Sequence, residues 1–303
     1  MNFQQLRIIR ETARCNFNLT EVANALLTSQ SGVSKHVKDF EDELGVELFV
    51  RRGKRLLGLT EAGKEAIEIV ERMLIDAQNL TEIGGRLSSG NEGTLRIVTT
   101  HTQARYTLPP IIASFKKTFP HVRLALNQAS PRDIAPILLE GETDIGIATD
   151  SMDNTPGLVT FPYLTWEHVV IVPVDHPLEA KKKLTLEDVS EFPIITYDEG
   201  LTGRARIDEA FARAGIIPDI AISALDADVI KSYVELGLGV GIIADMAFDT
   251  ERDTKLRKLG GGMFDSNTSS IGIRRGRYLR GYVYRFIELC SPALKESLVR
   301  KSL

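Results

Sequence analysis

The sequence contains few of the residues that build disulfide frameworks, metal centres or membrane spans. Of its 303 residues, two are cysteines and five are histidines. Cys15 and Cys290 lie far apart, and no metal-ligand spacing is present, so we expect reduced thiols and no metal. No apolar run approaches the ~18 residues of a membrane span, and the N-terminus lacks the apolar core of a secretion signal. We therefore expect a cytoplasmic protein with no membrane partner.

The motifs of common enzyme classes are also missing. The segment ELGLGVGII has glycines spaced G-x-G-x-G, but it leaves a predicted helix and enters a strand, which is the reverse of a dinucleotide-binding loop. No G-x-S-x-G elbow occurs. Asp144 and Asp150 flank a predicted strand without an identifiable acid–base partner. The sequence predicts no catalytic residue and no cofactor, so we do not expect an enzyme.

The net charge of −4 hides an uneven distribution of charge along the chain. Residues 1–64 carry ten Lys/Arg against eight Asp/Glu, whereas the remainder carries 27 against 33. Four of the five residues in RRGKR, at 51–55, are basic. Positive charge is therefore concentrated in the first part of the chain, where a nucleic acid could bind.

Residues 19–44 have the pattern of two short helices joined by a tight turn. The apolar stripe of the first is Val22, Ala23 and Leu26, and that of the second is Val33, Val37, Phe40 and Leu44. Thr28 or Ser29 can accept hydrogen bonds from the free N–H groups at the start of the second helix. So tight a connection predicts a helix-turn-helix, in which the second helix lies in the DNA major groove.

The polar start of the second helix and the segment after it supply the predicted DNA contacts. Gln30 can read adenine, and Lys35 can reach guanine or phosphate. Residues 47–63 predict a β-hairpin with a turn at Gly53, a wing whose basic tip follows phosphates. A capped surface helix in an enzyme is the alternative interpretation of the helix alone. The predicted contacts are Thr28, Ser29, Gln30, Ser31, Ser34, Lys35, Arg51, Arg52, Lys54 and Arg55.

A long helix is predicted after the wing, with Thr60 as its cap. Its heptad seam is Ala66, Val70, Met73, Ala77, Leu80, Gly84 and Leu87. Such a seam favours pairing with a second copy, and packing against the helix's own domain is the alternative. The Gly- and Ser-rich segment 84–93 predicts a hinge. We expect a winged helix-turn-helix domain at 1–59 and a dimerisation helix with a hinge at 60–92.

From Thr94 onward, strand-like and helical segments alternate, which is typical of an α/β domain with a largely parallel sheet. The final helix is expected from about Tyr278. Two such sets follow one another, so residues 93–303 predict an effector-binding domain of two α/β lobes. The first lobe is expected at about 93–162 and 268–303, and the second at about 163–267. Two similar lobes imply a cleft between them, like that of type II periplasmic binding proteins, which are solute receptors.

Hydroxyl and amide side chains follow several of the predicted strands. Ligands of open α/β sheets bind beyond the carboxyl ends of the strands, where helix N-termini present free N–H groups. Such a site suits a small anion like sulfate or a carboxylate. Any one of these residues could be an ordinary helix cap, and the prediction depends on their convergence. The predicted effector-binding residues are Thr100, Thr102, Gln103, Ser130, Thr149 and Thr202.

The N-terminal motifs resemble those of LysR-type transcriptional regulators. The family pattern around the recognition helix is met by Ser29, Gln30, Val33, Ser34, Lys35, Val37, Phe40, Glu41, Leu44, Gly45, Leu48, Phe49, Arg51, Leu59, Thr60, Ala62 and Gly63. The chain departs from it at Ser31, where most members have proline. It also departs at Lys54 and Arg55, which shift the spacing of the usual second arginine.

Further segments, among them TTHTQARYTLP, TGRARID and DADVIK, are similar to the CysB/Cbl branch of that family, along essentially the whole chain. The branch controls genes for sulfate assimilation and for alternative sulfur sources such as sulfonates. The resemblance implies an effector such as sulfate, adenosine phosphosulfate or acetylserine, in contact with Thr100, Thr102, Gln103, Thr149 and Thr202. It also implies a homotetramer, a dimer of dimers, that bends promoter DNA, with RNA polymerase as a further possible partner. A solute-binding receptor, or a regulator of an unrelated pathway, is the alternative.

Overall fold

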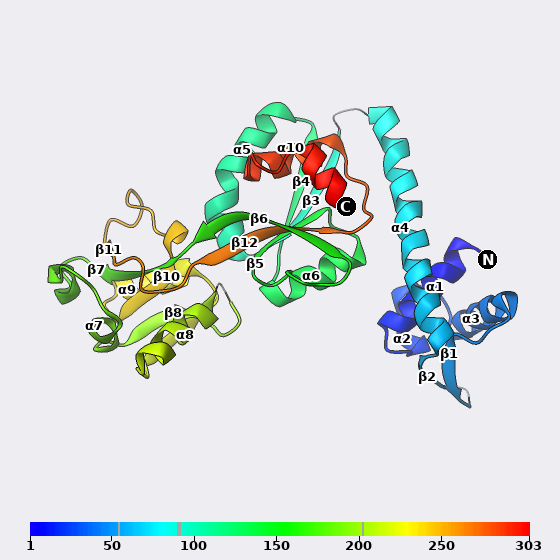
Figure 1. Cartoon of the computed structure of the whole chain (residues 1–303), viewed down its shortest axis with the longest axis horizontal. Helices are drawn as coiled ribbons and strands as arrows, with labels where there is room; N and C mark the ends of the chain where they lie inside the picture. The colour runs from blue at the N-terminus through cyan, green and yellow to red at the C-terminus, as the bar shows by residue number, and fades with distance from the viewer. Residues whose placement is uncertain (54, 90–91, 202) are drawn as a thin grey trace. The chain divides into compact units, whose positions relative to one another are not determined.

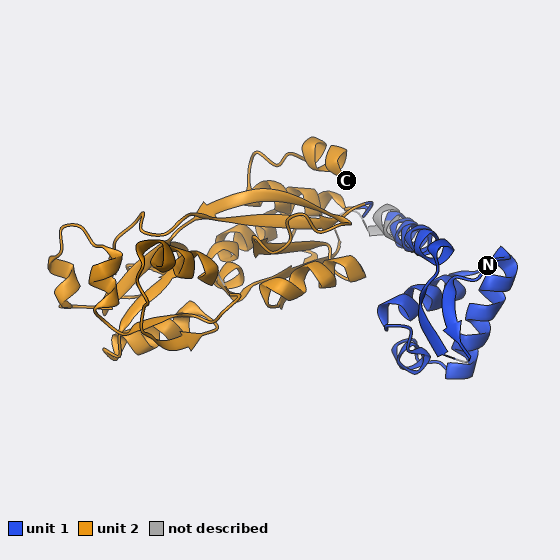
Figure 2. Cartoon of the chain, turned by 60° about the horizontal axis from the view of Figure 1, so that its bottom comes forward, with its two compact units in different colours: residues 1–88, 276–278 blue, residues 89–275, 279–303 orange. Residues whose placement is uncertain are grey.

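The computed structural model describes residues 1–53, 55–89, 92–201 and 203–303. Lys54 and Thr202, two of the predicted contact residues, lie outside the described residues. The chain divides into two compact units (Figure 2): residues 1–88 with 276–278, and residues 89–275 with 279–303. Within the described ranges, no helix combines the length and the apolar character that a membrane crossing needs. Cys15 and Cys290 are free thiols.

The first unit is a set of helices with a two-stranded hairpin (Figure 1). Its elements are α1 (Phe3–Arg14), α2 (Leu19–Ala25), α3 (Gln30–Leu44), β1 (Phe49–Arg52), β2 (Arg55–Leu59) and α4 (Glu61–Ser89). The predicted wing is confirmed, because β1 and β2 pair antiparallel around Gly53, whose φ is 62°. Helix α1 was not predicted, although Asn2 and Gln5 form a reciprocal capping box at its start.

The core of the first unit confirms most of the predicted apolar stripes. Val22, Val33 and Val37 are fully or almost fully buried, together with Ile8 of α1 and Phe49 of β1. Leucines at the helix ends behave differently. The prediction that Leu44 is a core residue is wrong, since its exposed fraction is 46%. Helix α3 ends at the left-handed Gly45, so its last turn extends past the helices that cover the rest of the stripe.

The two halves of α4 differ in how deeply their apolar residues are buried. In its first half, Val70 and Leu74 are buried in the core of the first unit, as the alternative interpretation of the heptad seam required. Beyond them, Leu80 is exposed at 68% and Ile83 at 40%. The apolar surface of the second half is therefore not covered by the helix's own domain.

The first lobe of the second unit is a five-stranded sheet in the order β4-β3-β5-β12-β6. Its strands are β3 (Gly93–Thr99), β4 (Val122–Gln128), β5 (Ile145–Thr149), β6 (Leu158–Trp166) and β12 (Asn267–Arg274). Its helices are η1 (Gln103–Thr107), α5 (Leu108–Thr118), α6 (Pro131–Glu140), α10 (Gly281–Cys290) and α11 (Glu296–Ser302). Strands β3, β4 and β5 are parallel, whereas β12 runs antiparallel to β5 and β6.

The second lobe is a five-stranded sheet in the order β11-β7-β10-β8-β9. Its strands are β7 (His168–Pro173), β8 (Ile194–Tyr197), β9 (Ile220–Ala224), β10 (Val240–Ala244) and β11 (Leu256–Leu259). Its helices are η2 (Pro177–Ala180), α7 (Leu186–Ser190), α8 (Arg204–Ala214), α9 (Ala227–Glu235) and η3 (Asp245–Ala247). Gly237, with a φ of 74°, ends α9, so the glycines of ELGLGVGII are a helix stop.

Several boundaries differ from the sequence-based expectation. Strand β6 belongs to the sheet of the first lobe up to Trp166, so that lobe continues past the expected boundary near 162. The final helical region begins at Gly281 rather than at about Tyr278. Strands β6 and β11 were not predicted, because neither has a simple alternation of apolar and polar residues.

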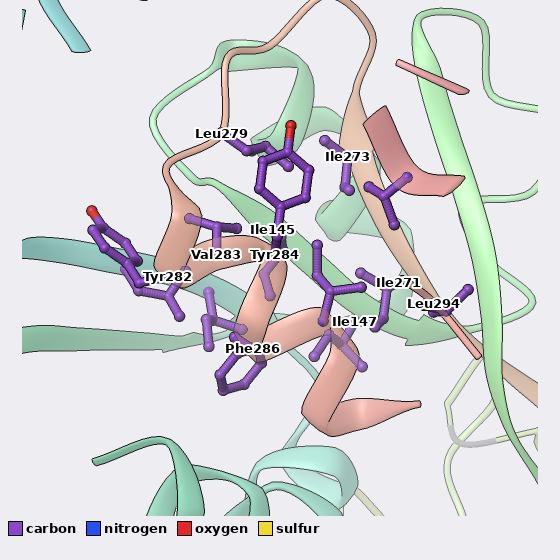
Figure 3. Packing of buried hydrophobic residues seen from close by; sticks show 14 of the residues in the cluster. Ile145, Ile147, Ile271, Ile273, Leu279, Tyr282, Val283, Tyr284, Phe286 and Leu294 are labelled. Atoms are coloured by element: carbon purple, nitrogen blue, oxygen red, sulfur yellow. The ribbon is translucent and has the colours of Figure 1, made fainter. Parts of the chain in front are cut away.

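Each lobe sheet is covered on both faces. In the first lobe α5 and α10 lie on one face and α6 on the other (Figure 1). Figure 3 shows the side of α10: Ile145, Ile147, Ile271 and Ile273 of the sheet lie with Phe286 of the helix in one buried cluster. In the second lobe, α9 packs against one face of the sheet and α8 against the other, each in its own buried apolar cluster. This leaves the carboxyl ends of β3, β5 and β8 to carry polar loops.

A substitution at Gly63 tests the packing of α4 against the wing. A Cβ at Gly63 would lie 2.0 Å from the carbonyl oxygen of Leu48, a backbone atom that cannot move aside. We expect Gly63→Ala to lower the free energy of unfolding of the first unit by at least about 1–3 kcal/mol, measured by scanning calorimetry. Gly58→Ala is the control, because nothing lies within 4 Å of a Cβ there. Equal effects of the two substitutions would refute this packing.

Candidate functional site

The start of α3 presents the predicted polar side chains to solvent. Ser29 is the N-cap, and its hydroxyl oxygen accepts a hydrogen bond of 3.1 Å from the N–H of Gly32. Gln30, Ser31 and Lys35 are exposed, as is Thr28, while Ser34 is half-buried. The Ser29 hydroxyl thus satisfies one of the free N–H groups at the helix start. The amide of Gln30 and the ammonium of Lys35 stay accessible to a ligand.

A hollow of about 680 Å³ lies between the start of α3, the wing and the α1–α2 turn. Gln30, Arg52 and Arg55 are in its lining, together with Asn16 and Asn18 of the turn. Sequence reasoning missed the turn because it did not predict α1. The hollow thus brings three predicted DNA contacts to one surface with two additional amide side chains.

Arg51 is paired with a buried carboxylate. Its guanidinium forms an ion pair with the carboxylate of Glu41, which is 6% exposed. The same carboxylate accepts hydrogen bonds from the N–H groups of Leu48 and Phe49 at 2.8 and 3.1 Å. Glu41 thereby ties α3 to the first strand of the wing, and Arg51 fixes the wing's position relative to the helix. Sequence reasoning did not assign this role to Glu41.

The second unit contains a pocket of about 360 Å³ between its lobes. Four of the predicted effector-binding residues line it: Thr100, Thr102, Gln103 and Thr149. Ser130 is not in the lining: its hydroxyl donates to the carboxylate of Asp133 in the first turn of α6, and the neighbouring Pro131 lines the pocket. Further lining residues, which were not predicted, are Asp150, Ser151, Trp166, Gly200, Gly203, Arg204, Ala205, Arg206 and Glu209.

An unusual helical turn places Gln103 in the pocket. Residues Gln103–Thr107 form a π-helix, and the N–H of Leu108 bonds the carbonyl of Gln103, five residues earlier. Pro109 and Pro110 follow in α5, and neither has the N–H that an α-helix would use to bond the carbonyls four residues before. The two prolines thus favour the wider turn, a type of insertion that often occurs at functional sites.

The buried hydroxyl of Ser269 orients the side chains at the pocket base. Its oxygen accepts hydrogen bonds from the indole N–H of Trp166 at 3.0 Å and from the amide N–H of Gln103 at 2.8 Å. Since a serine oxygen accepts at most two hydrogen bonds, its own proton is donated to Thr149 Oγ1, at 2.9 Å. The hydroxyl proton of Thr149 and the second amide proton of Gln103 are then available to a ligand.

The oxygen of the Gln103 amide is also fixed by its neighbours. Gln103 Oε1 accepts hydrogen bonds from the hydroxyl of Thr107, at 2.6 Å, and from that of Tyr163. Burial raises the pKa of the Tyr163 phenol, so that group stays protonated and donates. With its oxygen occupied, Gln103 presents only N–H to Ser269 and to the pocket.

Charged side chains also line the pocket. Arg206 lies in the lining, with its guanidinium 3.8 Å from Asp150 and 3.4 Å from Glu209. Arg204 also lines it but is 8% exposed, and it donates to the carbonyl of Tyr197 and to Asp208, at 2.8 Å from the latter. Burial raises the pKa of Asp150, an effect that Arg206 opposes. The segment TGRARID contained both arginines, but their spacing on α8 did not indicate which faces the pocket.

Two family models together match almost the whole chain. One, a bacterial regulatory helix-turn-helix protein of the lysR family, matches residues 3–64, and the LysR substrate binding domain matches residues 88–295. The chain belongs to the LysR family of transcriptional regulators. The resemblance predicted from the recognition helix and the wing is thereby confirmed, as is the two-lobed α/β architecture.

Relatives of this LysR regulator are similar to it over essentially their whole length. It is 54% identical to the HTH-type transcriptional regulator SsuR of Burkholderia cenocepacia, over 98% of this chain and 97% of SsuR. It is 51% identical to the regulator cbl of Escherichia coli K12, over 100% of this chain and 96% of cbl. The crystal structure of the cofactor-binding domain of the Cbl regulator matches with a TM-score of 0.67 and 48% identity, over 70% of this chain and 93% of that one. Because these relatives are named as regulators, the prediction of a non-enzyme is also confirmed.

Replacing Ser269 tests the hydrogen-bond network at the base of the pocket. Ser269→Ala leaves the buried N–H groups of Trp166 and Gln103 without their acceptor, and one such group costs about 1–3 kcal/mol. We expect the free energy of unfolding of the second unit to fall by about that amount in urea, followed by the fluorescence of Trp166, the single tryptophan. Ser223→Ala, at an exposed position of β9, is the control. Stability like that of the control would contradict the assigned network.

Proposed function

We propose that this LysR regulator controls genes of sulfur assimilation or sulfonate utilisation in the cytoplasm. It binds promoter DNA through α3 and the wing, and it responds to a small anionic effector: sulfate, adenosine phosphosulfate or acetylserine. The observation that carries the proposal is the pocket in which Thr100, Thr102, Gln103 and Thr149 converge. The likeness to SsuR and cbl supports the sulfur assignment.

The first unit supports the proposed DNA contacts. Gln30 and Lys35 at the start of α3 are the base-reading side chains, because both are exposed and an α-helix fits the major groove. Arg52 and Arg55 of the wing contact phosphates. Arg51 contributes chiefly by positioning the wing, since Glu41 neutralises it. The remaining proposed contacts are Thr28, Ser29, Ser31, Ser34 and Lys54.

The second unit supports an oxyanion as the effector. The amide oxygen of Gln103 has both acceptor positions engaged, the hydroxyl oxygen of Thr149 accepts from Ser269, and each side chain keeps one proton for a ligand. An anion with several oxygens, such as sulfate, accepts all such donors at once. Arg206 adds a positive charge in the lining. A volume of about 360 Å³ also has room for an effector larger than sulfate, such as adenosine phosphosulfate.

Exposed apolar side chains support the proposed homo-oligomer, a dimer of dimers. Leu225 and the α9 residues Val229 and Tyr233, with Leu236 at its C-cap, have exposed fractions of 70, 40, 39 and 71%. Leu80 of α4 is exposed at 68%. Val229, Tyr233 and Leu236 are spaced four and three residues apart and so share one face of α9, and an exposed apolar face of this kind is typical of a protein interface. RNA polymerase is a further proposed partner, on the family resemblance alone. A solute receptor is not favoured, since the same chain carries the winged helix.

The DNA half of the proposal is tested with the chain's own upstream region. We expect Gln30→Ala and Lys35→Ala each to weaken binding by about five- to 150-fold, since a specific base contact contributes roughly 1–3 kcal/mol. Arg52→Ala is expected to reduce the slope of log K against log salt by about one, as for one phosphate contact. Lys64→Ala, an exposed lysine on α4, is the control. Binding by the α3 variants equal to the control would contradict the interface.

The effector half is tested by thermal unfolding with sulfate, adenosine phosphosulfate and acetylserine. A ligand at 100 times its Kd stabilises the folded state by about 2.7 kcal/mol. We expect at least one of the three to protect the wild type. Thr149→Val should lose most of that protection because its hydroxyl proton is gone, and Thr118→Val, exposed on α5, should keep it. If none of the three protects the wild type, the ligand class is wrong and a regulator of another pathway is favoured.

A further inference from the structure

The π-helix that carries Gln103 also contacts the second lobe. Its first residue lines the pocket, while Arg105 and Tyr106, two and three positions later, reach α9 of the second lobe. The tyrosine hydroxyl donates a hydrogen bond of 2.7 Å to Asp228 Oδ1, and Arg105 Nε donates one of 3.2 Å to Asp228 Oδ2. Each oxygen of one carboxylate thus accepts from a different side chain of the first lobe.

Asp228 and Tyr106 are themselves firmly placed. Asp228 lies in the first turn of α9, where the helix dipole favours a carboxylate. The ring of Tyr106 packs against the buried apolar cluster of the second lobe, although the residue belongs to the first. Lys231 Nζ lies 5.2 Å from the ring centroid and 3.1 Å from the buried carboxylate of Asp253. Burial and the bond to Asp228 raise the pKa of Tyr106, so the phenol keeps the proton that it donates.

These contacts lie outside the effector pocket yet start from the same helical turn. Arg105, Tyr106 and Asp228 are absent from the pocket lining, whereas Gln103 belongs to it. A shift of the second lobe relative to the first would break the bonds to Asp228 or pull the π-helix with it. In either case the position of Gln103 depends on where α9 lies.

We propose that Tyr106 and Arg105, bonded to Asp228, form an interlobe clamp that holds the pocket in its effector-binding arrangement. They are positioning residues and do not touch the effector. The inference rests on the proposed effector function and deepens it. Affinity for an effector scales with the fraction of molecules whose lobes are correctly arranged, so breaking the clamp lowers affinity without removing a ligand contact.

The test compares Tyr106→Phe with Thr118→Val in the full-length protein. Thr118 is exposed on α5, and its replacement also removes one hydroxyl group. Calorimetric titration with sulfate and with adenosine phosphosulfate is expected to give roughly two- to tenfold weaker binding for Tyr106→Phe, the effect of one hydrogen bond, and unchanged binding for the control. Without effector, Tyr106→Phe should bind DNA with the wild-type affinity. This measurement is the folding control, because a generally unfolded variant would also lose DNA binding.

A second pair of measurements separates this inference from the proposed function. Asp228→Ala should weaken binding at least as much as Tyr106→Phe, and the double variant should add little, since both remove the same bond. Amide hydrogen exchange without ligand should be faster in residues 103–108 of Tyr106→Phe than in the control. If the wild type binds neither anion, the proposed effector class fails, and the exchange result still decides the clamp. Wild-type affinity and exchange rates in Tyr106→Phe would overturn the clamp while leaving the effector function intact.

Discussion

The pocket of this regulator depends on one buried hydroxyl. Ser269 on β12 accepts from Trp166 on β6 and from Gln103 on the π-helix, so its own proton must go to Thr149 on β5. Four elements are thereby held by a single oxygen whose donors and acceptors are all assigned. The consequence extends to the pocket, because Gln103 and Thr149 each keep one proton that Ser269 does not use. The proposed preference for an oxygen-rich anion follows from these protons and does not need a charged side chain.

The DNA-binding unit uses the same principle with a carboxylate. Glu41 accepts from two N–H groups of the wing and pairs with Arg51, so one buried side chain of α3 sets the position of the hairpin. Leu48, Phe49 and Leu56 already anchor the base of the wing in the apolar core, and Glu41 adds a polar tie to the recognition helix. In both units, therefore, a buried polar residue that contacts no ligand fixes those proposed to do so. Replacing such a residue is expected to disturb a ligand-binding surface from beneath.

How much could be predicted from the sequence differs between the core and the polar network. The stripe of Val33, Val37 and Phe40 has helical spacing, and local periodicity indicated both the helix and its buried face. Strand ends followed by hydroxyls located Thr100 and Thr149, because parallel strands bring their carboxyl ends together. The prediction for Leu44 was wrong because this residue lies past the end of the core, and Ser130, which bonds its own helix turn, is not in the pocket lining. Ser269, Glu41 and Arg206 could not be found, since their partners come from distant segments and only the tertiary fold brings them together.

In the proposed effector site, protons directed by buried partners hold an oxyanion at the pocket base. The decisive experiment is a crystal structure of the protein grown with sulfate or adenosine phosphosulfate. We expect anion oxygens at about 2.6–3.1 Å from both Thr149 Oγ1 and Gln103 Nε2, with Ser269 still bonded to Trp166. An anion bound elsewhere, or a pocket filled by the protein's own side chains, would contradict it.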